Sequence, residues 1–165
     1  MNLRLISVAI ALVVSAVLLG AGIYESVVLA PNLQGAPISL EHARGFYHVT
    51  NPGAFFRVVS PATQLFLLLA LVCNWRPPVT RWSLAGGLAL AILADVITFK
   101  FHYPRNTTLF LAPLTGPAAD LDRVATEWAA GNYVRIVLVL TAVVLVMLSM
   151  IRIARDTAPE EHRLS

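Results

Sequence analysis

Charged residues are scarce in this chain. Asp, Glu, Lys and Arg make up only 13% of its 165 residues, whereas water-soluble domains carry about a quarter. Hydrophobic residues make up 58% of the sequence, and the mean hydropathy is +0.74. The apolar residues form long runs and do not alternate with polar ones. This composition excludes a water-soluble enzyme domain and a disordered chain, and it indicates a protein of the lipid bilayer.

Cysteine and lysine are almost missing as well. Cys73 is the only cysteine, which excludes an intramolecular disulfide and a cysteine-based metal cluster. Lys100 is the only lysine, and the other basic residues are arginines scattered between the apolar runs. The net charge is +3, but the basic residues form no patch. In a membrane protein, such scattered arginines determine the topology more often than they bind an anionic polymer. We therefore expect no nucleic-acid partner.

Four segments meet the requirement of about 20 mostly apolar residues for a membrane-crossing helix. They cover about residues 5–30, 54–73, 82–101 and 133–151. The sequence therefore predicts an all-α, integral membrane four-helix bundle that forms one domain over residues 1–165, with a flexible tail at 156–165. The connectors 31–53 and 102–132 carry proline and glycine. The first segment could instead be a cleaved signal peptide, but its apolar run exceeds the usual 7–15 residues of such a peptide.

The arginines predict the orientation of the bundle. Arg4, Arg76, Arg81, Arg152 and Arg155 all fall on one side if the four spans alternate. Cytoplasmic loops carry the excess of Arg and Lys, so both termini are expected in the cytoplasm and both long connectors outside. The Arg-, Ala- and Val-rich usage favours a bacterial source. The expected location is the bacterial plasma membrane.

Polar residues gather near the outward end of every span. An ionisable side chain inside a span costs several kcal/mol unless it is paired or hydrated. We therefore expect these polar stripes to face each other around one outward cavity, where they act as ion-paired staples, as a functional site, or as both. The stripes comprise Tyr24 and Glu25; Arg57, Ser60 and Gln64; Asp95 and His102; and Trp128, Asn132 and Arg135.

Small residues continue the face of Asp95 toward the other end of its span. Ala91 and Gly87 lie at helical spacing from Asp95. Small side chains let two membrane helices approach closely. We expect a tight helix contact at these two positions.

Three histidines of the sequence are candidate metal ligands. His42, His48 and His102 fall on the outward side and could ligate zinc or iron together with Glu25 or Asp95. The spacing is not diagnostic, because no His-x-x-x-His or Glu-x-x-His pair occurs in a predicted span. No histidine lies deep enough in a span for a b-type haem. The sequence therefore predicts neither a metal nor another cofactor.

Four stretches of the sequence form one pattern together. They are residues 21–33, residues 51–55, residues 98–109, and Trp128 with residues 132–135. This pattern resembles the anthrone oxygenase-like family of four-span membrane proteins. The most characteristic part is a Pro-x-Asn turn at Pro104–Asn106 combined with the Trp…Asn-x-x-Arg opening of span four. The chain departs from the family at His102 and at Gly131, where members often carry Asn and Trp.

The resemblance implies a helical bundle with a site built from Tyr24, Asn106, Asn132 and Arg135. It also implies oxidation of an anthrone to an anthraquinone by dioxygen without an added cofactor. Such a reaction needs a base to form a carbanion and donors to stabilise the enolate.

We assign the candidate residues to two roles. The substrate-binding set is Tyr24, Arg57, Asn106, Trp128 and Asn132. The catalytic set is Glu25, Asp95 or His102 as the base and Arg135, with Asn132, as the donor to the enolate.

Two other functions remain open. The chain could be an accessory subunit of a larger membrane complex with purely structural polar stripes, or a transporter protomer. Four spans without inverted repeats make transport the weaker alternative. Besides the bilayer, the expected partners are a small lipophilic ligand and a homo-oligomer or larger complex. An outward cavity of about 300 Å³ or more would favour ligand binding over an accessory role.

Overall fold

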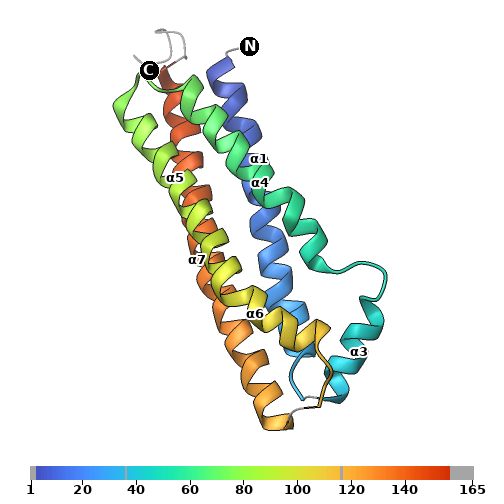
Figure 1. The fold of residues 1–165 in the computed structure, drawn as a ribbon. Helices are drawn as coiled ribbons and strands as arrows, with labels where there is room; N and C mark the ends of the chain where they lie inside the picture. Colours follow the sequence, from blue (N-terminus) through green and yellow to red (C-terminus); the bar gives the residue numbers. More distant parts are fainter. Residues whose placement is uncertain (1–2, 36, 116, 157–165) are drawn as a thin grey trace.

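The computed structural model describes residues 3–35, 37–115 and 117–156 (Figure 1). About 88% of the structure is helix, and its described part contains no strand. Four helical stretches are long and apolar enough to cross a membrane, as predicted. Their bounds are Leu3–Asn32, Pro52–Cys73, Pro78–Leu111 and Ala118–Asp156. The all-α fold and the four candidate spans are confirmed, while the expected tail lies, from residue 157 on, outside the described residues.

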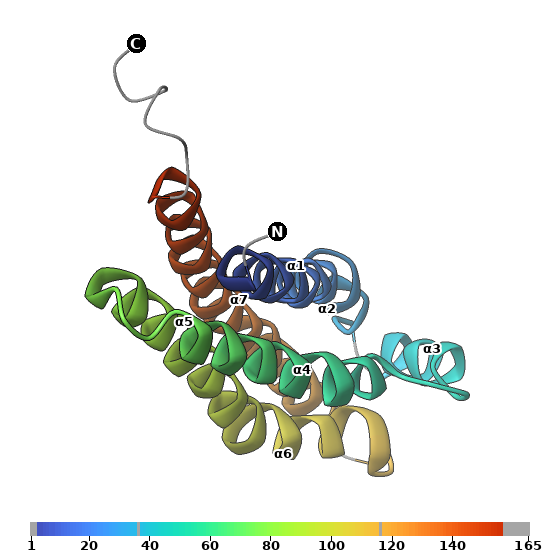
Figure 2. The same cartoon turned by 90° about the horizontal axis from the view of Figure 1, so that it is seen from above.

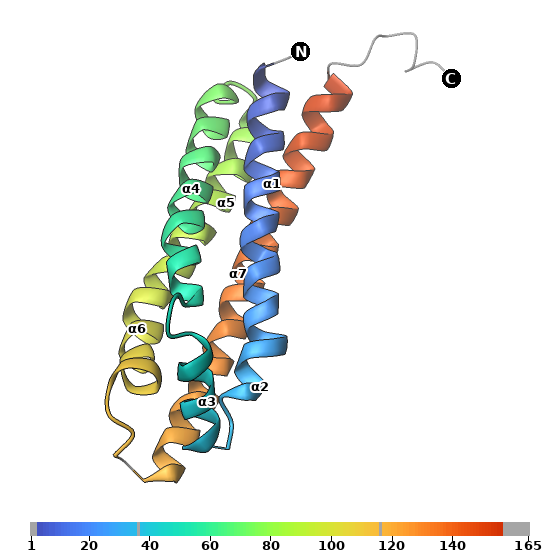
Figure 3. The same ribbon diagram turned by 90° about the vertical axis from the view of Figure 1, so that its right-hand side faces the viewer.

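Four long helices form the bundle. They are α1 (Leu3–Tyr24), α4 (Pro52–Cys73), α5 (Pro78–Ile97) and α7 (Ala118–Asp156). Seen from above, each of them packs against two neighbours, in the cyclic order α1, α4, α5, α7 (Figure 2). The backbones of the diagonal pairs, α1 with α5 and α4 with α7, stay apart within the described residues. Helix α1 begins and α7 ends at the same end of the bundle, here named the terminal end (Figures 1 and 3).

The terminal end is a tightly packed apolar core. Leu67 from α4, Leu84 from α5 and Val146 from α7 are fully buried in it. A side-chain carbon added at Gly87 would lie 3.5 Å from Cγ2 of Val146 and 3.6 Å from the carbonyl oxygen of Ala142. Gly87 and Ala91 are both buried where α5 packs against α7. The predicted close helix contact is therefore confirmed.

Two of the spans contain π-helical turns in their second half. The first span continues from α1 through η1 (Glu25–Leu29) into α2 (Ala30–Asn32). The third continues from α5 through η2 (Thr98–His102), α6 (Tyr103–Asn106) and η3 (Thr107–Leu111). These π turns lie in the half of the bundle opposite to the termini, here named the connector end (Figure 3).

Prolines account for two of these π turns. Pro31 follows η1 by two residues, and Pro104 follows η2 by two residues. Proline has no N–H group, and its ring collides with the carbonyl group four residues earlier. In each case the residue before the proline donates its N–H five residues back, Ala30 to Glu25 and Tyr103 to Thr98. The wider turn relieves the collision, so the chain stays helical through Pro104–Asn106, and the predicted turn at these residues is wrong.

The two long connectors also contain helices. Residues 31–53 contain α3 (Ile38–Phe46), and helix α7 already begins at Ala118. Arg44 of α3 donates hydrogen bonds to the carbonyl oxygens of Leu109 (2.8 Å) and Thr108 (3.1 Å). This clamp ties α3 to the end of the third span. A separate apolar cluster packs beneath it and includes Leu33, Leu40, Leu109, Leu121 and Trp128.

Candidate functional site

A cavity of about 480 Å³ lies at the connector end of the bundle. Its walls come from η1, the start of α4, the end of α5, the segment η2–α6–η3, and α7. The volume falls within the range of small-molecule sites and exceeds the roughly 300 Å³ at their lower limit. The apolar wall includes Leu29, Phe56, Phe99, Phe110 and Trp128. Most of its ionisable side chains come from the predicted polar stripes.

Glu25 and Arg135 form an ion pair on one wall. Oε2 of Glu25 lies 3.5 Å from Nη1 of Arg135, and both side chains are largely buried. The same guanidinium nitrogen donates a hydrogen bond of 2.9 Å to Oδ1 of Asn132. The Arg135 guanidinium also lies over the ring of Phe56, 5.1 Å from its centroid. Arg135 of the fourth span thus contacts Glu25 of the first span through an ion pair and Phe56 of the second span through a cation–π contact.

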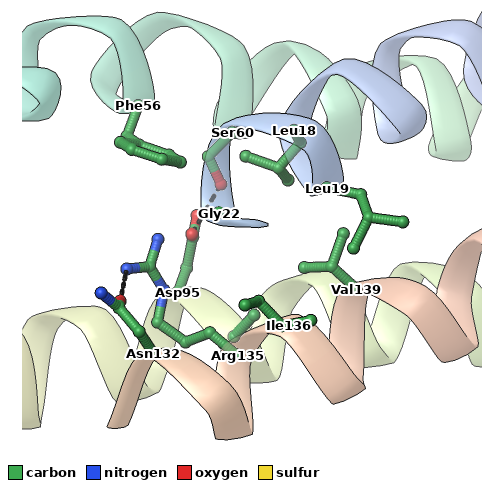
Figure 4. Close-up of a pocket in the computed structure, with 11 residues that line it drawn as sticks. Leu18, Leu19, Gly22, Phe56, Ser60, Asp95, Asn132, Arg135, Ile136 and Val139 are labelled. Atoms are coloured by element: carbon green, nitrogen blue, oxygen red, sulfur yellow. Dashed lines mark hydrogen bonds between the residues drawn. The ribbon is translucent and has the colours of Figure 1, made fainter. Parts of the chain in front are cut away.

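Asp95 is held by two neutral donors from α4. The Ser60 hydroxyl donates to Oδ1 of Asp95 and the Gln64 amide donates to Oδ2, both at 2.6 Å. Asp95 and Arg135 also line a second, much smaller pocket of about 20 Å³ next to the large cavity (Figure 4). That volume holds about one water molecule. Both carboxylate oxygens of Asp95 therefore have donors inside the protein.

His102 is the buried polar side chain of the cavity with the fewest partners. It is 1% exposed and lines the cavity from η2. Neither ring nitrogen has a hydrogen-bond partner of ordinary geometry within the described residues. The edge of the Trp128 ring contacts the imidazole, with 5.7 Å between centroids. Since an unpaired buried polar group costs about 1–3 kcal/mol, a ligand that bonds His102 would recover part of that cost.

Gly131 makes this position of His102 possible. A side-chain carbon added at Gly131 would lie 3.0 Å from Nε2 of His102 and only 2.5 Å from Cε1 of Phe101. The Phe101 ring cannot retreat easily, because the Arg105 guanidinium lies 3.5 Å from its centroid on one face. Glycine at 131 thus allows η2 to approach α7 closely. This is the position where the sequence departs from the expected tryptophan.

Trp128 fixes the orientation of Asn106. The indole Nε1 of Trp128 donates a hydrogen bond of 2.7 Å to Oδ1 of Asn106, and both residues line the cavity. With Oδ1 engaged, the Asn106 amide nitrogen is the part of the side chain that remains to donate to a ligand. Asn106 and His102 both belong to the third span, one helical turn apart. The pair offers a nitrogen acceptor and an N–H donor on one wall.

Tyr47 reaches the cavity from the connector between the first two spans. Burial raises the pKa of its phenol, and the neighbouring Tyr24 phenol and Glu25 carboxylate act in the same direction. The Tyr47 hydroxyl therefore stays protonated at neutral pH and can donate a hydrogen bond. Burial also lowers the pKa of the Arg44 guanidinium that clamps this connector to η3.

The structure places most of the predicted site residues around the one cavity. Seven of the nine line it, namely Glu25, Arg57, Asp95, His102, Asn106, Trp128 and Arg135. Tyr24 is 52% exposed and does not line the cavity. Asn132 lines only the small pocket, where it bonds Arg135.

Other residues line the cavity but are not among the predicted site residues. Tyr47 and Asn51 lie in the predicted connector 31–53, and Thr98 and Phe110 lie in the π turns of the third span. Proline shortly after an apolar run is the one sequence signal that could have indicated these turns, because both π turns before a proline line the cavity.

The histidines do not form a metal site in the described part of the chain. No three His, Cys, Asp or Glu side chains come together there in a group that could hold a metal ion. His42 and His48 are exposed on and after α3, and neither lines the cavity. The Nδ1 atom of His48 lies 2.9 Å from the carbonyl oxygen of Gly45. His102 is thus the one histidine of the three at the cavity wall.

No protein-family model, curated protein or solved structure matches this chain. The resemblance to the anthrone oxygenase-like family therefore stays a prediction. The cavity and the side chains around it are therefore the features of the molecule that bear on its function.

Proposed function

We propose that this chain binds a small, flat, lipophilic molecule in the cavity and oxidises it with dioxygen, in the manner of an anthrone oxygenase. The observation that carries the proposal is the cavity of about 480 Å³ bounded by apolar rings and a few polar groups. A helix bundle with a purely structural role is expected to fill this space with side chains. Binding sites for small molecules combine such a volume with few, well-placed polar groups.

His102 is the best-placed base of the three candidates. Glu25 is engaged by Arg135, and Asp95 accepts hydrogen bonds from Ser60 and Gln64. The imidazole of His102 has no ion pair and no side-chain hydrogen bond among the described residues, and it borders the cavity. A ring nitrogen without a proton can accept one from a weakly acidic carbon that lies against it.

Asn106 is the best-placed donor for the negative charge that develops on the substrate. Proton removal from a carbon next to a carbonyl group moves the charge onto the carbonyl oxygen. The Asn106 amide, oriented by Trp128, can donate to that oxygen. Trp128 is then a positioning residue, since it acts through Asn106.

The proposed reaction balances without a further reactant. The base removes one proton from the CH₂ carbon of the substrate, and the resulting carbanion adds dioxygen to give a peroxide anion at that carbon. The peroxide anion takes the proton back from the base and becomes a hydroperoxide. Loss of water from the hydroperoxide leaves a second carbonyl group. One dioxygen is consumed, and one quinone and one water are formed.

The test is the oxidation of anthrone by the protein purified in detergent and saturated with air. We expect anthraquinone to form faster than in protein-free micelles, and His102→Gln to lower the catalysed rate by about 10²-fold or more. Arg123→Gln, on the exposed surface of α7, is the matched control and should keep the wild-type rate. A folded wild-type protein that does not exceed the protein-free rate would contradict the oxygenase proposal.

An accessory subunit is the second candidate, and a specific observation favours it. The ion pair of Glu25 with Arg135 joins the first and fourth spans, and the hydrogen bonds of Ser60 and Gln64 to Asp95 join the second and third, without any ligand. Native mass spectrometry of the purified protein separates the two candidates. A small lipophilic adduct supports the binding function, whereas a stoichiometric foreign subunit without an adduct supports the accessory role.

We also propose that the chain lies in a bacterial plasma membrane with both termini in the cytoplasm. The positive-inside rule supports this orientation, since the short loop after α4 carries Arg76 and Arg81. In a Cys73→Ser background, Val49→Cys should react with a membrane-impermeant maleimide added to intact cells, and Arg76→Cys should not. The reverse labelling pattern would contradict the orientation.

A further inference from the structure

Arg57 differs from the other charged residues of the cavity. Arg135 pairs with Glu25, and Asp95 accepts two hydrogen bonds from α4. Arg57 also lines the cavity, but it is exposed, and no carboxylate of the described residues forms an ion pair with it. One guanidinium at the cavity is therefore left without a counter-charge.

Arg57 lies at the mouth of the cavity. The cavity wall contains exposed residues on two sides only, the start of α4 and the segment η2–α6–η3. Within the described residues, the backbone of α4 stays apart from those of η2, α6 and η3, although all of them line the cavity. The mouth therefore opens sideways between these elements, at the connector end of two candidate membrane spans.

The other residues of the mouth carry no charge. Opposite to Arg57 lie Phe99 and Tyr103, which are 58% and 42% exposed and pack edge to face at 5.0 Å between centroids. Leu111 is 75% exposed at the far end of the same side. The mouth thus combines an aromatic and apolar lip on one side with a single positive charge on the other.

We infer that the cavity takes a lipophilic acid, and that Arg57 selects it by binding its anionic group at the mouth. This inference rests on the proposed binding function and names its substrate class: an apolar ring system with one carboxylate or similar oxyanion. The ring system enters from the bilayer and lies between the aromatic side chains of the cavity. The anionic group remains at the mouth, where the guanidinium donates charge-assisted hydrogen bonds to it.

The experiment compares two fluorescent probes that differ only in charge, anthracene-2-carboxylate and anthracene-2-carboxamide. Their affinities are measured by energy transfer from the tryptophans of the protein in dodecyl maltoside, a detergent without phosphate. We expect the wild type to bind the carboxylate about tenfold more tightly than the carboxamide. Arg57→Gln should abolish this preference and leave the carboxamide affinity unchanged.

Lys100→Gln is the matched control, because it removes an exposed positive charge from the same end of the bundle outside the cavity wall. It should keep the tenfold preference. If Arg57→Gln and Lys100→Gln lose the preference for the carboxylate probe equally, the preference comes from the overall positive charge of this end of the bundle, and the role of Arg57 is overturned. A preference that persists in Arg57→Gln would overturn it as well.

Two further outcomes separate this inference from the proposed function. Wild-type protein that binds both probes equally well overturns the selection of acids but supports the binding function. Folded protein that binds neither probe overturns both. The titration is repeated in phosphatidylcholine nanodiscs. If the wild type loses its preference for the carboxylate probe there, Arg57 binds the phosphate group of a lipid, and the inference is overturned.

Discussion

The two halves of the bundle have the same apolar character but different interiors. At the terminal end, regular helices with small residues pack into a continuous core around Leu67, Leu84 and Val146. At the connector end, π turns interrupt the first and third spans, and a cavity of about 480 Å³ lies between the helices. The difference teaches that hydropathy predicts which segments form long apolar helices, whereas backbone regularity decides whether the interior between these helices is filled.

Polar groups bond across helices in both halves, but the connector end engages buried carboxylates. At the terminal end, Ser15 and Ser149 donate to carbonyl oxygens four residues earlier in their own helices, and Arg4 of α1 donates to the side chain of Asn74 at the end of α4. At the connector end, polar side chains bond across helices, as Ser60 does with Asp95 and Arg135 with Glu25. Hydrogen bonds within one helix leave packing undisturbed, while bonds between helices make each partner dependent on the other.

Loss of the buried ion pair should give the largest effect. Arg135→Ala leaves the Glu25 carboxylate buried without its partner, and we expect it to lower the free energy of unfolding by about 3–5 kcal/mol. Unfolding in mixed micelles with increasing SDS measures this change. Arg123→Ala, which breaks exposed pairs on α7, should leave the stability nearly unchanged. Equal effects of both variants would show that the cavity pair does not hold the connector end together.

The packed and hollow halves should respond differently to truncation of leucine. Leu84→Ala removes a fully buried side chain from the packed core, and we expect a loss of about 3 kcal/mol. Leu29→Ala should cost only roughly 1–2 kcal/mol, because Leu29 is 4% exposed but has the cavity on one side and fewer atoms to contact. The same SDS titration compares the two. A loss of unfolding free energy in Leu29→Ala as large as in Leu84→Ala would contradict the presence of an empty cavity beside Leu29.

Glycine substitutions give a third test of the comparison. Gly131→Ala forces a carbon against the Phe101 ring and His102, and we expect it to destabilise the protein by about 1–3 kcal/mol. Gly20→Ala is the control, since no atom lies within 4 Å of the added carbon. It should stabilise α1 by about 0.5–1 kcal/mol, as expected for an exposed helical glycine. A tolerated Gly131→Ala would contradict the close approach of η2 to α7.

The smallest effect is expected from single hydroxyl groups. Ser60→Ala removes one of the two donors to Asp95 and should cost about 1 kcal/mol, since Gln64 still donates to the other oxygen. Ser83→Ala removes an exposed hydroxyl that bonds only its own helix at Val79, and its effect should be close to zero. Thermal unfolding in detergent distinguishes the two variants. No difference between them would show that Ser60 contributes little to the contact of α4 with α5.

The sequence by itself determined the number and nature of the helices. Long apolar runs with few charges cannot fold as alternating strands, and the cost of charge in a span placed the polar residues together at one depth. Ala91 and Gly87 also predicted a close helix contact on their face of α5, because small side chains let a neighbouring helix approach, whereas the structure identified α7 as the partner. These inferences needed only the periodicity and polarity of each helix alone.

Only the tertiary structure decided which polar residues pair, and which line the cavity. Glu25 pairs with Arg135 and Asp95 binds Ser60 and Gln64 because the helices follow the order α1, α4, α5, α7, and sequence spacing within one helix does not specify that order. The π turns rotate every later residue of the spans that contain them. They therefore continue the helix through Pro104, which helical periodicity of 3.6 residues does not predict.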